Sequence, residues 1–99
     1  MKFKNDANVN MTSLRGTVRT TFAELVMVFG KPDCGPFDYS LDKTTCEWHL
    51  EFEDGVIATI YDWKMGDTPM FEYDWHIGGR SAEAVDRVIQ SLSKELSNV

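Results

Sequence analysis

Residues 46–79 read CEWHLEFEDGVIATIYDWKMGDTPMFEYDWHIGG and contain three runs in which apolar and polar side chains alternate. Alternation with a period of two is the pattern of a half-buried β-strand. Asp54-Gly55 separates the first two runs, and this dipeptide is typical of the two-residue turn of a β-hairpin, because both of its residues tolerate a positive φ. We therefore expect a three-stranded antiparallel meander, with strands near 46–53, 56–63 and 70–77.

A two-residue turn would also fix the register of the first hairpin. It pairs Glu53 with Val56, and every later pair follows from this one. One face of the hairpin would then form the core, with Cys46, Trp48, Leu50, Phe52, Ile57, Thr59, Tyr61 and Trp63. The other face would place acidic residues beside an apolar row of Val56, Ala58 and Ile60. Because an exposed apolar row or an open strand edge invites association, we expect a homodimer.

Helical patterns lie on both sides of the meander. Thr21-Phe22-Ala23-Glu24 has the sequence of a capping box, and apolar residues follow at helical spacing until Gly30 and Pro32. After the meander, Ser81 is a suitable N-cap for an apolar stripe of Val85, Val88, Ile89, Leu92 and Leu96. We expect helices near 18–29 and 81–96. The predicted fold is a two-layer α+β domain in the order α-β-β-β-α.

The chain has 99 residues, of which 42% are hydrophobic, and a net charge of −6. This size fits a single domain, 1–99, in which residues 1–13 form a loose or weakly paired N-terminal arm. No apolar run is long enough to span a membrane, and residues 1–6 lack the apolar segment of a signal peptide. We therefore expect a cytoplasmic protein without membrane contact. Cys34 and Cys46 match no metal or redox spacing and should be free thiols.

The charge is unevenly distributed along the chain. Residues 33–74 hold eleven acidic side chains and two lysines, whereas residues 1–31 hold five basic and two acidic side chains. The acidic middle of the protein would repel phosphates, so direct binding of DNA or RNA is disfavoured. It would attract a basic partner.

The polar face of the predicted sheet carries two histidines and several carboxylates. These are Glu47, His49, Glu51, Asp62, Asp74 and His76. Such groups could bind a divalent metal or transfer protons. However, alternation alone places polar residues on a solvated strand face, and no metal-binding spacing is present. We expect no catalytic residue, no metal and no cofactor.

Gly78-Gly79-Arg80 leads into the second helix and offers a place for an anion. Free N–H groups, the helix dipole and the guanidinium group would converge there. The simpler interpretation is that the two glycines only turn the chain from strand to helix.

The tripeptide Tyr-Asp-Trp occurs twice, at 61–63 and 73–75. These rings could be core residues, but two short helices cannot cover so many large aromatic side chains. Surplus Trp and Tyr are typical of interface hot spots and of pockets that stack a planar ligand. The candidate binding residues are Trp63, Tyr73, Asp74, Trp75, His76, Gly78, Gly79 and Arg80.

Five segments of the chain are distinctive: FGKP at 29–32, CEW at 46–48, FEDG at 52–55, ATIYDWK at 58–64 and YDWHIGG at 73–79. Together they resemble a family of small, functionally uncharacterised proteins encoded by tailed bacteriophages. The resemblance covers about residues 12–92. It implies a phage origin and a setting in the host cytoplasm, and it brings no established activity or site residues.

From these observations we expect a non-enzymatic viral protein that sequesters or blocks a host factor, such as a component of host defence. The alternative is a small-molecule binder that captures a nucleotide-like anionic ligand between aromatic rings and Arg80. A host protein is the expected partner ahead of a small anionic ligand.

Overall fold

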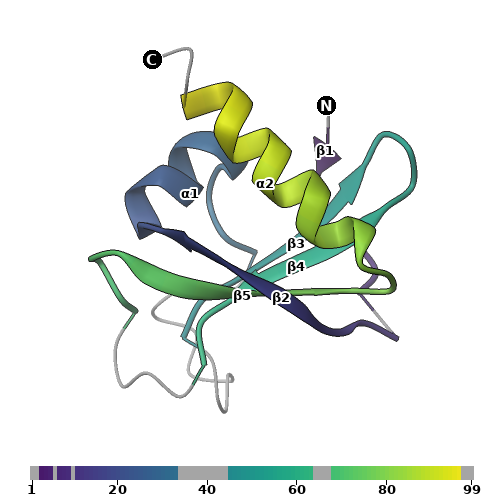
Figure 1. Ribbon diagram of the computed structural model, residues 1–99, viewed down its shortest axis with the longest axis horizontal. Coiled ribbons are helices and arrows are strands. Elements are labelled where there is room, and N and C mark those ends of the chain that lie inside the picture. The colour runs from purple at the N-terminus through teal and green to yellow at the C-terminus, as the bar shows by residue number, and fades with distance from the viewer. Residues whose placement is uncertain (1–2, 6, 10, 34–44, 64–67, 97–99) are drawn as a thin grey trace.

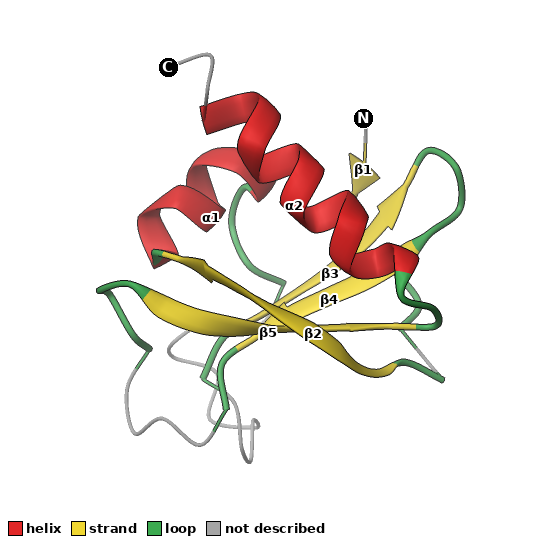
Figure 2. Ribbon diagram, viewed as in Figure 1, coloured by secondary structure: helices red, strands yellow, loops and turns green. Residues whose placement is uncertain are grey.

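The computed structural model of the protein describes residues 3–5, 7–9, 11–33, 45–63 and 68–96. They form an α+β fold in which two helices lie on one face of an antiparallel sheet (Figure 1). The elements in chain order are β1 (Phe3–Lys4), β2 (Ser13–Thr20), α1 (Phe22–Phe29), β3 (Glu47–Phe52), β4 (Ile57–Tyr61), β5 (Tyr73–Gly79) and α2 (Glu83–Leu96). Figure 2 shows both helices above the sheet and its other face below.

The sheet has five strands in the order β1-β3-β4-β5-β2. The predicted meander is its centre, β3-β4-β5, and two further strands form the edges. The expectation of three strands was therefore too coarse, and residues 3–4 and 13 belong to strands instead of a loose arm. Residues 18–20 end β2 and do not begin the first helix. Only Val18 gives β2 a large side chain that packs against the core, so its alternation is too weak to recognise.

The hairpin of β3 and β4 has a three-residue loop, and the predicted register is wrong by one residue. Phe52 N donates to Val56 O at 2.9 Å, and Gly55 N donates to Phe52 O at 2.9 Å. Gly55 has a φ of 86°, as the last position of such a loop requires. Consequently Trp48 pairs with Ile60, where the two-residue turn would have paired it with Tyr61.

This shift exchanges the two faces of β4, because neighbouring residues of a strand point to opposite sides. Ala58 and Ile60 now lie on the helix-covered face with no exposed surface, and Val56 packs against the same core. Ile57, Thr59 and Tyr61 lie on the opposite face. The apolar row that was expected to drive dimerisation is therefore part of the core, and that reason for a homodimer is wrong.

The core lies between the sheet and both helices. Trp48 is fully buried, and its ring meets those of Trp75 and Phe22 at centroid distances of 5.7 and 5.8 Å. Its Nε1 donates to Gly30 O at 2.9 Å, which ties β3 to the end of α1. The predicted core positions of Trp48, Leu50 and Phe52 are confirmed. The members of the main cluster are Leu25, Val28, Phe29, Cys46, Trp48, Leu50, Phe52, Ala58, Ile60, Trp75, Ile77, Ala84, Val88 and Leu92.

Helix α2 packs its apolar stripe on the sheet, slightly rotated from the predicted stripe. Ala84, Val88, Ser91 and Leu92 are buried, while Ile89 is exposed. Arg87 Nε donates to Asp54 Oδ2 at 2.8 Å, so the helix also holds the tip of the β3–β4 hairpin.

Helix α1 begins with the predicted capping box. Thr21 Oγ1 accepts from Glu24 N at 3.1 Å, and Glu24 Oε1 accepts from Thr21 N at 3.1 Å. Thr20 Oγ1 donates to the same carboxylate oxygen at 3.0 Å. These hydrogen bonds stabilise the ionised carboxylate and lower the pKa of Glu24, with that from Thr20 contributing most.

The capping box gives a stability prediction. Replacing Thr21 with alanine removes the acceptor for Glu24 N and should lower the free energy of unfolding by about 1 kcal/mol. Urea denaturation measures this loss. Thr21→Ser keeps a capping hydroxyl and should lose clearly less, so equal losses for the two variants would contradict the capping role.

Candidate functional site

The face of the sheet away from the helices, called here the open face, is polar and aromatic. Strand alternation and register place Glu47, His49, Glu51, Ile57, Thr59, Tyr61, Asp74, His76 and Gly78 on it. Tyr61 lies flat on His76, with ring centroids 5.4 Å apart and an interplanar angle of 15°. Nε2 of His49 lies 2.9 Å from Glu47 Oε1. The open face therefore brings together two histidines, a carboxylate and a phenol.

The N-terminal part of the chain crosses this face. Strands β1 and β2 lie at opposite edges of the sheet, so the chain that joins them must pass from one edge to the other. Ala7 N donates to His49 O at 3.3 Å, and the Asn8 carbonyl accepts from Arg80 Nη2 at 3.0 Å. We call the described residues 7–9, 11 and 12 the crossing segment. It covers part of the open face and forms one wall of a hollow there.

This hollow, the open-face pocket, has a volume of about 260 Å³. Its lining consists of Val9, Thr12, Ser13, Glu47, Thr59, Tyr61, Trp63 and Gly78. The rings of Tyr61 and Trp63 meet edge to face, with centroids 6.4 Å apart. Gly78 lies opposite Thr59 in the sheet, and a Cβ at Gly78 would overlap Thr59 Oγ1. The glycine thus makes room for the side chains of β4 that line the pocket.

Burial, and then the nearby negative charge of Glu47, raise the pKa of Tyr61 above its ordinary value of 10.0. Both causes disfavour the phenolate. Removing the Glu47 carboxylate would remove only the smaller cause, the nearby negative charge, and would leave the burial.

This gives a prediction for the titration of Tyr61. Glu47→Gln should lower the pKa of Tyr61 relative to the wild type, and the pKa should stay above 10.0 because burial remains. Absorbance at the tyrosinate band against pH measures it, with Tyr61→Phe identifying the Tyr61 component. Glu51→Gln, on the same face of β3, is the matched control and should leave this pKa unchanged. A Tyr61 pKa that does not move in Glu47→Gln would contradict the described proximity.

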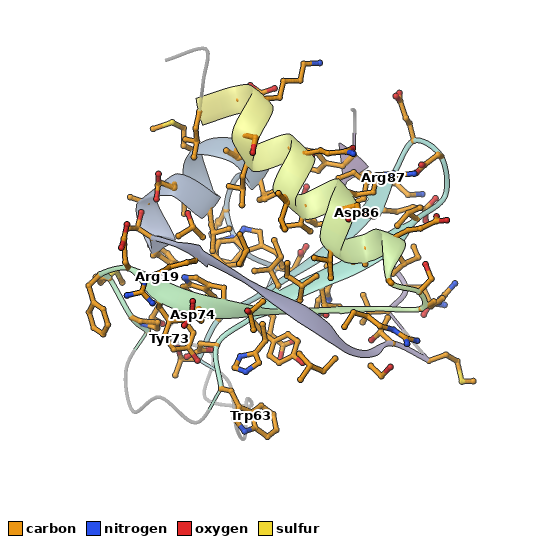
Figure 3. The ribbon with its side chains drawn as sticks, in the orientation of Figure 1. Arg19, Trp63, Tyr73, Asp74, Asp86 and Arg87 are labelled. Carbon is orange, nitrogen blue, oxygen red and sulfur yellow. The ribbon has the colours of Figure 1, made fainter. Side chains whose placement is uncertain are left out.

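The structure places the predicted site residues on both sides of the sheet. His76 and Gly78 lie on the open face, and Asp74 forms an exposed ion pair with Arg19 at 3.3 Å (Figure 3). Tyr73 is half-buried, and its hydroxyl accepts from Trp63 N at 3.1 Å. The buried Nδ1 of His76 has no hydrogen-bond partner among the described residues.

Trp75 lies on the helix-covered face and has no exposed surface. Its ring packs against Trp48 and, at 5.5 Å, against Tyr73. Its side chain therefore cannot contact a partner, and its proposed contact role is replaced by a role in the core.

Gly79 and Arg80 make packing contacts at the start of α2. A Cβ at Gly79 would overlap the Cβ of Ala84, so this glycine lets the helix approach β5. Arg15 donates to the carbonyl oxygens of Gly79 and Arg80, both at 3.0 Å. Arg80 itself donates to Asn8 O in the crossing segment. Close packing thus accounts for both glycines, and the predicted anion site gains no separate support from them.

Asp62, considered above as a member of the polar face, is fully buried. Its carboxylate accepts from Thr45 N and Thr45 Oγ1, both at 2.7 Å, and from Cys46 N at 3.1 Å. It therefore fixes the start of β3 against the end of β4. Within the part of the chain that the structure describes, no three His, Cys, Asp or Glu side chains are grouped as metal ligands. Cys34 lies outside the described residues.

Three large apolar side chains are exposed on the two arms of the β4–β5 connection. Trp63 is 42% exposed, Met70 60% and Phe71 65%. Figure 3 shows Trp63 projecting away from the sheet and from both helices. Glu72 and Asp74 follow within three residues of Phe71, and their side chains are largely exposed. We call these five residues the connection surface.

Sequence reasoning missed most of the pocket lining. Tyr61 and Thr59 were placed on the core face because of the register, and residues 9, 12 and 13 were treated as a loose arm. A polar segment such as Val9–Ser13 carries no periodic signal, so only the position of β1 and β2 at opposite edges reveals that it crosses the sheet.

Comparison with protein-family models, curated proteins and solved structures finds no match to this chain. No helix among the described residues is both long enough and apolar enough to cross a membrane.

Proposed function

We propose that this protein is a non-enzymatic binding protein that sequesters or blocks a host factor, and that it binds through the connection surface. The resemblance to tailed-phage proteins supports a host partner and action in the host cytoplasm. Host defence components are among the candidate targets. The chemistry of the surface supports a protein partner with a basic binding region.

The observation that carries the proposal is the exposure of Trp63. The other two tryptophans, Trp48 and Trp75, are fully buried, whereas 42% of Trp63 faces solvent. Exposed groups of large apolar side chains commonly mark binding sites, and Trp is enriched among residues that dominate binding energy. The Trp63 backbone N–H donates to the Tyr73 hydroxyl, and this hydrogen bond fixes the backbone from which the exposed ring projects.

The acidic residues of the connection surface indicate that the partner's binding region is positively charged. Glu72 and Asp74 lie close to Met70 and Phe71 along the chain, and Arg19 pairs with both acids, at 3.5 and 3.3 Å. Opposite charge on a partner would speed the encounter at low ionic strength. We therefore expect the association rate to fall as salt concentration rises.

Affinity capture from host lysate tests the proposal with matched variants. Trp63→Ala should abolish capture of a partner that the wild type retains, and should weaken the purified complex about 30-fold or more if Trp63 is a hot spot. Met27→Ala is the control, because Met27 is 60% exposed on α1, outside the connection surface. Circular dichroism checks that each variant is folded. An identical set of captured proteins for wild type and Trp63→Ala would refute the connection surface as the binding site.

The runner-up function, capture of a nucleotide-like anion, has weaker support. Glu47 lines the open-face pocket and would repel phosphate, while Arg80 is not among its described lining residues. Arg80→Glu tests it directly: loss of binding of a phosphate-bearing ligand in this variant would favour the anion binder.

A homodimer remains a proposal, with pairing along the edge strand β2 as one route. Strand β2 is an edge of the sheet, although the register irregularity between Leu14 and Gly16 disfavours regular pairing along it. Sedimentation at micromolar concentration that shows only the 11.3 kDa species would contradict the dimer.

A further inference from the structure

We propose that the open-face pocket binds the arginine side chain of a protein partner. The inference rests on the proposed function, because Trp63 belongs both to the connection surface and to the pocket lining. It goes further by assigning a chemical group to a defined cavity.

The size of the pocket favours a side chain over a nucleotide. Its volume is about 260 Å³, below the roughly 300–1,000 Å³ typical of sites for drug-sized ligands. A guanidinium group with its alkyl stem is much smaller than such a ligand. A base, sugar and phosphate together are considerably larger than that group and its stem.

The charge of the lining favours a cation. Glu47 contributes a carboxylate, and no Lys or Arg is among the described lining residues. The Glu47 side chain is only 25% exposed, so its charge is screened less than that of a fully solvated carboxylate. One of its oxygens lies 2.9 Å from His49 Nε2, and a carboxylate offers about four acceptor sites, so it can accept from several donors at once.

The aromatic walls favour arginine over lysine. Tyr61 and Trp63 contact each other edge to face at an interplanar angle of 68°, and the Trp63 side chain is 42% exposed, so a planar cation beside this pair can stack on the Trp63 ring. Guanidinium groups stack on aromatic faces, are weakly hydrated and bind carboxylates through two parallel hydrogen bonds. An ammonium group lacks the planar shape and is more strongly hydrated. Thr59, on the open face of β4, adds a hydroxyl to the lining.

Charge complementarity identifies a protein as the source of this arginine. Residues 33–74, which include half of the pocket lining and all of the connection surface, hold eleven acids and two lysines. A basic protein region would meet this acidic surface while one arginine enters the pocket. A single guanidinium makes few contacts, so most of the affinity must come from the surrounding interface.

Titration with small probes tests the pocket separately from any partner. The ¹H–¹⁵N NMR spectrum of the protein is followed as N-acetyl-argininamide, N-acetyl-lysinamide or N-acetyl-citrullinamide is added. Citrulline has nearly the shape of arginine without its charge. We expect saturable millimolar binding of the arginine probe with shifts centred on Ser13, Thr59 and Gly78, several-fold weaker binding of the lysine probe, and none of the citrulline probe.

Glu47→Gln should weaken the binding of the arginine probe about tenfold. Glu51→Gln, on the same strand face, should bind the probe with the wild-type affinity, because Glu51 is not among the residues that line the pocket. The spectrum itself shows whether each variant is folded. Adenosine monophosphate (AMP) is titrated in the same way. The inference would be overturned by equal binding of the arginine and citrulline probes, by unchanged arginine binding in Glu47→Gln, or by shifts at the pocket with AMP instead of the arginine probe.

The two proposals can fail independently. If the arginine probe does not bind but Trp63→Ala still abolishes partner capture, the pocket inference is wrong and the proposed function stands. If the arginine probe binds as expected but neither Trp63→Ala nor Glu47→Gln changes the captured proteins, the pocket does accept a guanidinium group. In that case the proposed function is wrong, and so is the inference that the arginine belongs to a protein partner.

Discussion

Replacing Trp48 with alanine should lower the free energy of unfolding by roughly 3–5 kcal/mol, the scale of aromatic truncations in protein cores. The ring has no exposed surface and contacts Trp75 and Phe22, so its removal leaves a cavity between the sheet and α1. The variant also loses the hydrogen bond from Nε1 to Gly30 O. Urea or guanidinium denaturation measures the change.

Trp63→Ala provides the matched control for Trp48, because it removes the same side chain from a position that is 42% exposed. It should cost clearly less. If Trp48→Ala does not fold, Trp48→Phe keeps most of the buried surface and permits a measurement. A loss below about 1 kcal/mol for Trp48→Ala would show that the ring does not support the core.

Replacing Gly79 with alanine should cost about 1–3 kcal/mol through overpacking. The new Cβ would overlap the Cβ of Ala84 and would lie 3.0 Å from Ile57 O and 3.2 Å from Ser81 O. Because two of these three neighbours are backbone atoms, the first turn of α2 must move away from β5. Thermal or chemical denaturation records the loss.

A double-mutant cycle separates this clash from a general effect of the substitution. Ala84→Gly alone should destabilise the helix by about 1 kcal/mol. Combined with Gly79→Ala, it removes the overlapping methyl group, so the double variant should be more stable than the sum of the single losses predicts, by at least about 0.5 kcal/mol. Additive losses would mean that the Gly79–Ala84 contact does not determine the helix position.

Local sequence alone determined the central strands, the capping box of α1 and the presence of α2. The three alternating runs became β3, β4 and β5, and Thr21 and Glu24 form the predicted capping box. These features depend on neighbours within a few residues, which is why they can be predicted without knowing the rest of the fold. The burial of Trp48 followed from the alternation of its own strand.

Tertiary structure decided the register, the edges of the sheet and the site. Asp54-Gly55 is compatible with a two-residue or a three-residue loop, and the single-residue difference moved Tyr61 from the core to the open face and Ile60 in the reverse direction. Strand β2 forms because β5 offers it backbone partners, although its own side chains give little signal. The sequence singled out both Tyr-Asp-Trp copies, but only the packed chain distinguishes the exposed Trp63 from the buried Trp75. The open-face pocket exists because the crossing segment must connect two opposite edges, a constraint that no stretch of the sequence carries by itself.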